Sequence, residues 1–389
     1  MASNARKPRA LVLLLAAGIA TLVALGLAEL TVRMFASKPR VLGAIAFQTE
    51  DGTPVADLAE AAAKGLVVQV PGKVPEQKPR RRYMFKPGTS FYITYADQEV
   101  LQRDWLDDQG RVLNRINSLG VREREELVAD KPEGQRRLVC IGDSFTFGWG
   151  IPEEQNWVRL LERELRAGGD DIRTVNCGAS GTVVIDEYVN GLQRRFHRFD
   201  PDAVVLTICL NDLVGSDGLM VFGPPIDTGS ALLDLCVGAI GHSPLDLSPD
   251  RDWIADLLAM PQVYPDGTPN PRFGPDKPYD AMWAQGTPQK ALRQGKAWCD
   301  ERGIPFLVVI WPFLQGLGEG RHYPFQKLHD LVAADLEEAG IPLLDVTPQL
   351  RGTNHEDLWV TPADTHPNPK AQQLVLPAIT AFVRAQTGW

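Results

Sequence analysis

Residues 138–148 read Leu-Val-Cys-Ile-Gly-Asp-Ser-Phe-Thr-Phe-Gly. The apolar run Leu138–Ile141 ends abruptly at Gly142, which predicts a buried strand that enters a tight turn. This turn places the hydroxyl of Ser144 at the carboxyl end of the strand, where open α/β sheets bind ligands. A helix is predicted shortly afterwards, and free backbone N–H groups at a helix amino end can stabilise an oxyanion. Ser144 is therefore a candidate nucleophile, and the alternative is a serine that only caps the helix.

Three further blocks of sequence follow in order. Residues 175–181 read Val-Asn-Cys-Gly-Ala-Ser-Gly, Asn211-Asp212 follows the strand-like run 203–210, and residues 364–368 read Asp-Thr-His-Pro-Asn. The order and spacing of the four blocks resemble those of the GDSL family, also called SGNH hydrolases. Residues 115–122 also resemble the lead-in before the serine block in the membrane-anchored, extracytoplasmic members.

The resemblance implies a role for each of five residues. Ser144 would be the nucleophile and His366 the base that takes its proton, because a serine hydroxyl is weakly reactive without one. Asp364 would orient the imidazole and stabilise its charged form. The oxyanion hole would be formed by the backbone N–H groups of Ser144 and Gly181 and the side-chain amide of Asn211.

Two positions depart from the family pattern. Cys209 stands where a glycine is usual, which is a modest change for a small side chain. Asp364 and His366 are separated by one residue instead of two, and we expect a sharp bend to bring their side chains together. Pro367 restricts that bend because it biases His366 towards extended conformations. Asp357 is the weaker alternative for the acid.

Other classes of chemistry find little support in the sequence. The chain has six histidines, and none forms a pair with metal-ligand spacing such as H-E-x-x-H. Phosphate-binding and dinucleotide-binding glycine motifs are also missing. We therefore expect neither metal nor cofactor. The net charge of −9 argues against nucleic-acid partners.

The amino terminus predicts a membrane helix over residues 1–35. Arg6, Lys7 and Arg9 precede an apolar run from Ala10 to about Leu30, which is long enough to cross a bilayer. Basic residues before the run favour a cytoplasmic start and an exported remainder, periplasmic or extracellular. The alternative is a cleaved signal peptide, which would make the protein secreted.

The remaining chain suggests a linker over residues 36–82, a β-rich extension over residues 83–136 and a hydrolase domain over residues 137–389. Strand candidates lie at 137–141, 172–176, 203–209, 304–310 and 341–346. Helical patterns lie at 153–167, 186–198, 287–302, 324–339 and 369–386. Such alternation predicts a parallel sheet between two helix layers. The expected fold is a three-layer α/β/α, SGNH-hydrolase-like and flavodoxin-like, with an amino-terminal transmembrane helix and a small β-rich extension.

The long segment 213–285 interrupts this alternation and follows Asn211 directly. It is either a lid or substrate wall beside the site, or a small satellite core. Among the five cysteines, Cys140, Cys177 and Cys209 fit buried thiols. Cys236 and Cys299 are candidates for a disulfide, which an exported chain permits.

These features predict a serine ester hydrolase that works through an acyl-enzyme. Its substrate would be an ester-bearing small molecule, polysaccharide or lipid, such as an O-acyl ester of envelope carbohydrate or lipid. An O-acyltransferase, which moves the acyl group to a sugar hydroxyl, needs the same residues. The alternative from another class is a non-catalytic glycan-binding protein of the envelope.

Overall fold

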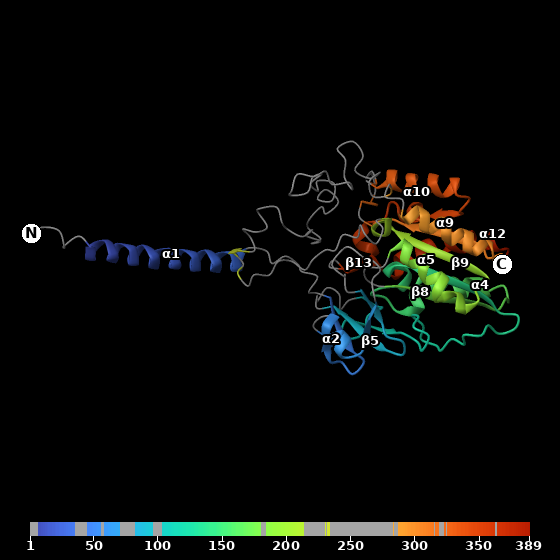
Figure 1. Ribbon diagram of the computed structural model, residues 1–389, viewed down its shortest axis with the longest axis horizontal. Coiled ribbons are helices and arrows are strands. Elements are labelled where there is room, and N and C mark those ends of the chain that lie inside the picture. The colour runs from blue at the N-terminus through green and yellow to red at the C-terminus, as the bar shows by residue number, and fades with distance from the viewer. Residues whose placement is uncertain are drawn as a thin grey trace, which may run out of the picture. The chain divides into compact units, whose positions relative to one another are not determined.

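The computed structural model describes residues 7–35, 45–55, 58–70, 82–95, 103–179, 184–213, 230, 232–233, 283, 287–314, 316–318, 323, 325–361 and 364–389. They fall into two units. The first contains the amino-terminal helix with residues 230 and 232–233, and the second contains all the others (Figure 1). Each unit is described by itself below.

The core of the second unit is a parallel five-stranded sheet. Its strands are β7 (Arg136–Gly142), β8 (Ile172–Gly178), β9 (Ala203–Cys209), β10 (Phe306–Trp311) and β11 (Leu343–Asp345). Their spatial order is β11-β10-β9-β7-β8, and every neighbouring pair is parallel. All seven residues of β9 are buried, as expected for a central strand covered on both faces.

Helices follow the strands in alternation. The segments are η3 (Glu153–Gln155), α4 (Trp157–Arg166), α5 (Ile185–Arg194), η4 (Phe196–Phe199), η5 (Leu210–Leu213), α9 (Thr287–Asp300), α10 (Gln326–Glu338), α11 (Thr347–Leu350), η7 (His355–Leu358) and α12 (Pro369–Thr387). The connections β7–β8 and β8–β9 cross the sheet in opposite directions, so right-handed crossovers place α4 and α5 on opposite faces. α5 packs beside α9, and α4 packs beside α12 (Figure 1). The expected three-layer fold is confirmed.

The β-rich extension begins earlier than expected. Its four-stranded antiparallel sheet has the order β2 (Pro54–Val55), β1 (Ile45–Thr49), β5 (Ser90–Tyr95), β6 (Arg111–Arg115). The short helix α2 (Leu58–Ala63) and the pair β3 (Val67–Val70) and β4 (Arg82–Phe85) complete it. The linker expected over residues 36–82 is therefore wrong for residues 45–55 and 58–70. The reason is that β1 gains its stability by pairing with β5, a contact that local composition does not show.

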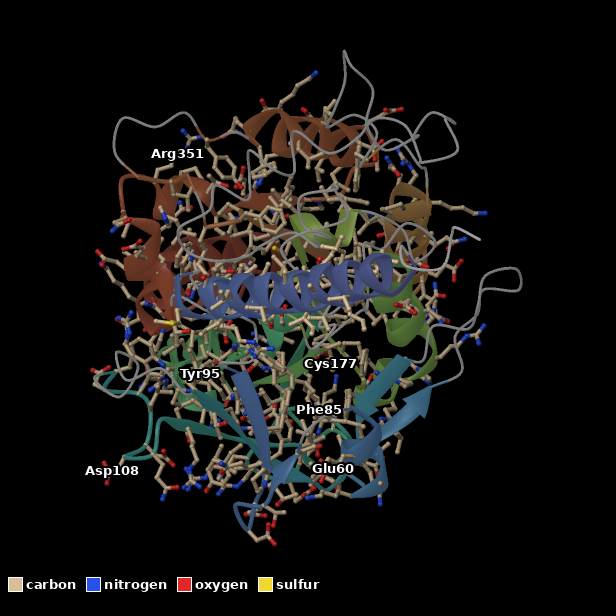
Figure 2. The ribbon with its side chains drawn as sticks, turned by 90° about the vertical axis from the view of Figure 1, so that its left-hand side faces the viewer. Glu60, Phe85, Tyr95, Asp108, Cys177 and Arg351 are labelled. Atoms are coloured by element: carbon tan, nitrogen blue, oxygen red, sulfur yellow. The ribbon has the colours of Figure 1, made fainter. Side chains whose placement is uncertain are left out.

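Aromatic side chains join the extension to the parallel sheet domain. Phe85, labelled in Figure 2, stacks on Phe91 of β5 at 4.3 Å between ring centroids and on Phe147 at 5.5 Å. Phe47 of β1 meets Trp149 edge-on at 5.7 Å. Phe147 and Trp149 belong to the segment that follows Ser144, so the extension packs directly behind the candidate nucleophile.

The side chain of Arg122 also holds the segment that follows Ser144. Its guanidinium is fully buried and donates hydrogen bonds to the backbone carbonyls of Phe147, Gly148 (2.6 Å) and Ile151 (2.6 Å). Burial lowers the pKa of Arg122 to about 10, so the group remains charged near neutral pH. One side chain thus supplies donors to three backbone carbonyls, and those of Phe147 and Gly148 each accept one further hydrogen bond at 3.4 Å.

The cysteines Cys140, Cys177, Cys209 and Cys299 are free and buried. Three of them were expected to be buried thiols, and this is confirmed. The expected disulfide of Cys299 is wrong, because Cys299 is a free thiol. It lies in α9, is completely buried and packs as a small apolar group. Cys236 lies outside the described residues.

The first unit contains α1 (Lys7–Phe35). Val12–Met34 is long and apolar enough to cross a membrane, with a mean hydropathy of 2.2 over its most apolar window. Near its carboxyl end Glu29 pairs with Arg33 at 2.6 Å. Glu29 also accepts hydrogen bonds from the hydroxyl of Ser230 and the backbone N–H of Leu232, both at 2.8 Å. Ser230 and Leu232 therefore contact α1.

We expect Arg122→Met to lower the free energy of unfolding by about 3–5 kcal/mol, because it removes three hydrogen bonds of a buried charged group while keeping much of the side-chain volume. The matched control is Arg124→Met. Arg124 pairs with Glu154 at 3.0 Å in solvent, so its loss should cost less than about 1 kcal/mol. Denaturant titration of the full chain in detergent measures both values. Equal losses in the two variants would contradict the role given to Arg122.

Candidate active site

The strand β7 delivers Ser144 to the start of the four-residue helix α3 (Ser144–Phe147). Asp143 is the amino cap of this helix, and its carboxylate accepts the backbone N–H of Phe145 at 2.9 Å. Two glycines let neighbouring segments approach closely here. A Cβ on Gly142 would lie 1.9 Å from the Thr207 hydroxyl, and one on Gly178 would lie 2.2 Å from the Phe147 nitrogen.

Hydrogen bonds connect Ser144, His366 and Asp364 in a chain. The Ser144 Oγ lies 2.8 Å from the Nε2 of His366. The Nδ1 of His366 lies 2.5 Å from the Oδ1 of Asp364. Asp364 is buried, whereas the side chain of His366 is 28% exposed. The structure thus brings His366 together with Ser144, which lies 222 positions earlier in the sequence, and with Asp364, which lies two positions earlier.

The strand β13 (Asp364–Pro367) explains how the short spacing works. It pairs in antiparallel fashion with β12 (Trp359–Thr361). The pairing register shifts between Thr361–Asp364 and Trp359–Pro367, so β13 contains an irregularity, and such a bulge bends its strand. The backbone N–H of His366 also donates to the Oδ1 of Asp364 at 3.3 Å. The expected bend agrees with these observations, and the Asp364 carboxylate lies beside the His366 imidazole. Pro367 favours an extended backbone at His366 itself.

The alternative acid Asp357 lies elsewhere. It belongs to η7, its side chain is 60% exposed, and it lies 3.6 Å from Lys370.

Asn368 has a structural role that the sequence analysis missed. Its amide donates to the carbonyls of Asp357 (2.8 Å) and Trp359 (3.0 Å), and its oxygen accepts the N–H of Ala371 at the start of α12. Asn368 therefore fixes the position of β13 against both neighbours.

Opposing effects set the basicity of His366. Burial by itself lowers the pKa of this imidazole, but the charge of Asp364 and its hydrogen bond raise it, and the charge of Asp143 adds to them. The net result is a pKa above the ordinary value. His366 therefore takes up a proton more readily than a free histidine, which suits a general base.

Two buried carboxylates lie behind the site. Burial raises the pKa of Asp143 to about 6, although the N–H of Phe145 and the charge of His366 act in the opposite direction. Burial also raises the pKa of Asp212 well above its ordinary value, and the charge of Asp143 raises it further. Asp212 accepts hydrogen bonds from the Tyr188 hydroxyl (2.8 Å) and the Cys209 N–H (2.9 Å), so it closes the turn after β9.

Tyr95 is a second residue that the sequence did not reveal. It ends β5 in the extension, and its hydroxyl donates a hydrogen bond to the Oδ2 of Asp364 at 2.6 Å. The alternation of buried and half-buried residues along β5 showed that Tyr95 points inward. It gave no sign of a partner 269 positions away.

The predicted oxyanion donors are only partly described. The backbone N–H of Ser144 lies at the amino end of α3. Gly181 lies outside the described residues. The backbone of Asn211 is in η5 directly after β9, but its side chain is not among those described. The roles of Gly181 and Asn211 therefore stay predictions. Of the insertion 213–285, only Leu213, Ser230, Leu232, Leu233 and Trp283 are described.

Aromatic rings surround the imidazole of His366. Phe145 lies edge-on at 5.8 Å and Trp149 is tilted at 5.9 Å between ring centroids.

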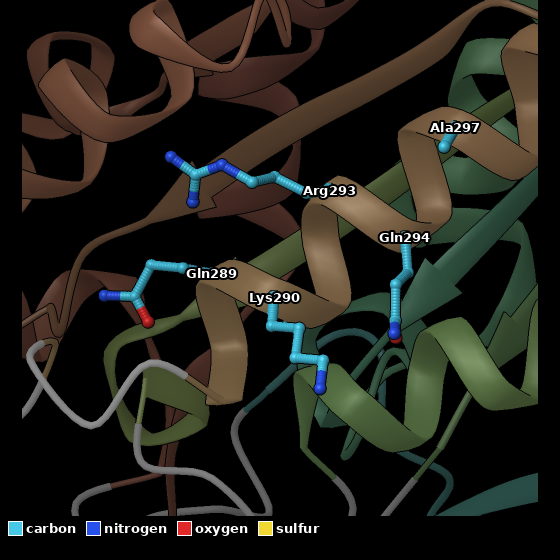
Figure 3. A pocket seen from close by; sticks show the side chains of 5 residues that line it. All are labelled: Gln289, Lys290, Arg293, Gln294 and Ala297. Carbon is cyan, nitrogen blue, oxygen red and sulfur yellow. The ribbon is translucent and has the colours of Figure 1, made fainter.

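A separate surface hollow lies along α9 and is lined by Gln289, Lys290, Arg293, Gln294 and Ala297 (Figure 3). Its lining contains neither serine, cysteine nor histidine. In the part of the chain that is described, no cluster of three histidine, cysteine or acidic side chains could hold a metal.

We expect Asp143→Asn to raise the free energy of unfolding at pH 8 by roughly 1–3 kcal/mol and to leave it unchanged at pH 4. A carboxyl whose folded pKa is raised, from 3.8 to about 6, stabilises the fold only while it is protonated. That contribution is complete below pH 3.8 and is lost as the pH rises through about 6. The amide keeps the cap on Phe145.

The same variant should move the acid limb of the pH–rate profile to lower pH, because the charge of Asp143 raises the pKa of His366. Denaturation at the two pH values and ester hydrolysis across pH measure these effects. A variant less stable than the parent at pH 8, or an acid limb moved to higher pH, would contradict this account of Asp143.

The chain is similar to several known proteins. The model of the GDSL-like lipase/acylhydrolase family matches residues 140–374, which is more than half of the chain. The chain is 32% identical over 101 residues to an arylesterase of Vibrio mimicus, covering 25% of this chain and 46% of that protein. It is 33% identical over 87 residues to esterase TesA of Pseudomonas aeruginosa, covering 22% and 40%. The matched segments thus span less than half the length of these curated relatives.

Solved structures with a similar fold include esterase EstA from Pseudoalteromonas, at 14% identity and a TM-score of 0.38, covering 65% of this chain and all of that one. An acetylxylan esterase from Geobacillus stearothermophilus has 12% identity and a TM-score of 0.38, covering 65% and 94%. The match of the family model extends from β7, which carries Ser144, to the first turns of α12, beyond His366. The chain belongs to the GDSL-like lipase/acylhydrolase family.

Proposed function

We propose that this protein is a carboxylic-ester hydrolase of the SGNH type that works through an acyl-enzyme. The hydrogen-bonded chain Ser144–His366–Asp364 supports this proposal most directly, because each distance is short enough for proton transfer or orientation. The related arylesterase and TesA, named as esterases, support the same class of reaction.

The proposed reaction has two steps. His366 takes the Ser144 proton as the oxygen attacks the ester carbonyl, and Asp364 stabilises the imidazolium. The backbone N–H groups of Ser144 and Gly181 and the amide of Asn211 stabilise the oxyanion that forms. His366 then gives its proton to the leaving alcohol, and water enters to release the acid from the acyl-enzyme.

The proposed location is the outer face of a membrane, with the hydrolase domain periplasmic or extracellular. The helix α1 supports it through its length and apolar composition, and the basic residues before it favour a cytoplasmic amino terminus. A cleaved segment would release the same domain as a secreted protein. The proposed substrate class is an O-acyl ester of envelope carbohydrate or lipid.

We also propose that residues 1–35 form the anchor and residues 137–389 the hydrolase domain, with an insertion at 213–285. Acyl transfer to a sugar hydroxyl uses the same catalytic residues, so a sugar acceptor could replace water. The non-catalytic alternative is less consistent with the geometry. A glycan-binding protein has no need for a serine hydroxyl placed 2.8 Å from an imidazole whose pKa is raised.

We expect Ser144→Ala to lower the hydrolysis of p-nitrophenyl acetate by about 10⁴-fold or more, since it removes the nucleophile. The fold should persist, because only one hydroxyl is lost. Turnover by the full chain in detergent measures the effect, and circular dichroism and thermal melting check the fold. The matched control is Ser118→Ala, which removes a hydroxyl from the exposed pair with Glu126. Turnover by Ser144→Ala equal to that of the control would refute the assignment.

Parallel assays with and without sugar acceptors separate hydrolysis from transfer. Free acid as the main product supports the hydrolase, and an acylated sugar as the main product supports the transferase. Neither product from the parent chain, over a range of acyl esters, would favour the non-catalytic alternative.

A further inference from the structure

The second carboxylate oxygen of Asp364 has a partner from a distant part of the chain. Oδ1 of Asp364 accepts hydrogen bonds from the Nδ1 of His366 at 2.5 Å and from the backbone N–H of His366 at 3.3 Å. Oδ2 accepts a hydrogen bond from the hydroxyl of Tyr95 at 2.6 Å. The side chain of Asp364 is only 1% exposed, so neither oxygen can rely on bulk water.

The contacts of His366 leave Oδ2 to a donor from elsewhere. On β13, the backbone N–H and the ring Nδ1 of His366 both reach the Oδ1 of Asp364. Among the described residues, Tyr95 makes the one recorded hydrogen bond to Oδ2. A buried carboxylate oxygen without a donor costs free energy and favours protonation of the group.

The position of the Tyr95 hydroxyl is closely defined. Its ring is 4% exposed, and its backbone N–H donates to the carbonyl of Gly110 at 3.1 Å. Gly150, with a φ of +75°, passes directly over the hydroxyl: a Cβ there would lie 2.3 Å from the oxygen. The same Cβ would lie 2.8 Å from Val360 of β12, the strand that pairs with β13. The Tyr95 hydroxyl is therefore closely packed between the extension, which carries β5, and the strand pair β12–β13, which carries His366.

We propose that Tyr95 is a positioning residue for the catalytic acid, so that the extension is a part of the active site. This inference rests on the proposed function. The Tyr95 hydroxyl holds Asp364 in the one orientation that presents Oδ1 to the Nδ1 of His366. Tyr95 itself transfers no proton. Its location at the border between the extension and the parallel sheet domain is shown in Figure 2.

The Tyr95 hydroxyl remains protonated and can therefore always donate its hydrogen bond to Asp364. Burial, followed by the charge of Asp364 and their hydrogen bond, raises the pKa of the Tyr95 hydroxyl well above its usual value. The phenol therefore keeps its proton throughout the pH range in which His366 titrates. A hydrogen bond to an ionised group is stronger than one between neutral groups, which makes this contact suitable for fixing a carboxylate.

The test compares Tyr95→Phe with Tyr92→Phe. Both variants remove one hydroxyl from β5 and keep the ring. Tyr92 lies on the opposite face of the strand, where its ring contacts the Arg111 guanidinium at 4.2 Å. We expect Tyr95→Phe to lower kcat for p-nitrophenyl acetate by about 10-fold with little change in KM, because the hydroxyl contacts the acid and not the substrate. Tyr92→Phe should leave kcat unchanged.

The pH profile distinguishes positioning from a merely structural role. Without the Tyr95 donor, the Asp364–His366 pair binds its proton more tightly, so the acid limb of kcat/KM should move to higher pH. The same shift should appear in an NMR titration of His366 in histidine-labelled full chain, with the resonance identified by its loss in His366→Asn. This titration requires no turnover and therefore separates the inference from the proposed function.

Absence of ester turnover in the parent chain would count against the proposed function alone. The inference would then depend on the titration: a higher pKa of the pair in Tyr95→Phe supports it. An unchanged pKa of His366 in Tyr95→Phe overturns the inference even if kcat falls, because the fall in kcat would then come from a disturbed fold. An equal response of Tyr92→Phe would also overturn it.

Discussion

The active site depends on one backbone constraint, the geometry of residues 364–367, which form the irregular strand β13. A register shift in its pairing with β12 bends this strand, and the Asp364 carboxylate lies beside the imidazole of His366 two positions later. Three features hold the strand in place. It pairs with β12, Pro367 favours an extended His366, and Asn368 hydrogen-bonds to β12 while capping α12. The base is therefore set at a junction between a strand and a helix that packs on α4.

The nucleophile is fixed by a separate set of contacts. The segment after Ser144 lies between the guanidinium of Arg122 and the aromatic rings of Phe47 and Phe85 from the extension. The extension also supplies the hydroxyl that reaches Asp364. Contacts from outside the parallel sheet thus support both ends of the Ser144–His366–Asp364 chain. This arrangement explains why strands at residues 45–95 matter to a site whose motifs begin at residue 142.

The sequence predicted the parallel sheet and the residues with distinct chemistry, because buried strands and the four motif blocks leave local signals. The motif residues Ser144, His366 and Asp364 are joined by hydrogen bonds, and the bend expected between Asp364 and His366 agrees with the register shift in β13. β1 and β2 were missed because they are short and are stabilised by a distant strand. No local pattern indicates that Tyr95 has a partner on β13.

The measurement that tests the account most directly is the turnover of Asp364→Asn beside that of Asp357→Asn. An amide at position 364 would favour the wrong tautomer of His366, and we expect a loss on the order of 10⁴-fold in kcat with the fold retained. Asp357, an exposed aspartate that pairs loosely with Lys370, should tolerate the same change. A value of kcat for Asp364→Asn within about tenfold of the parent would contradict the account, because His366 would then act without the acid that β13 provides.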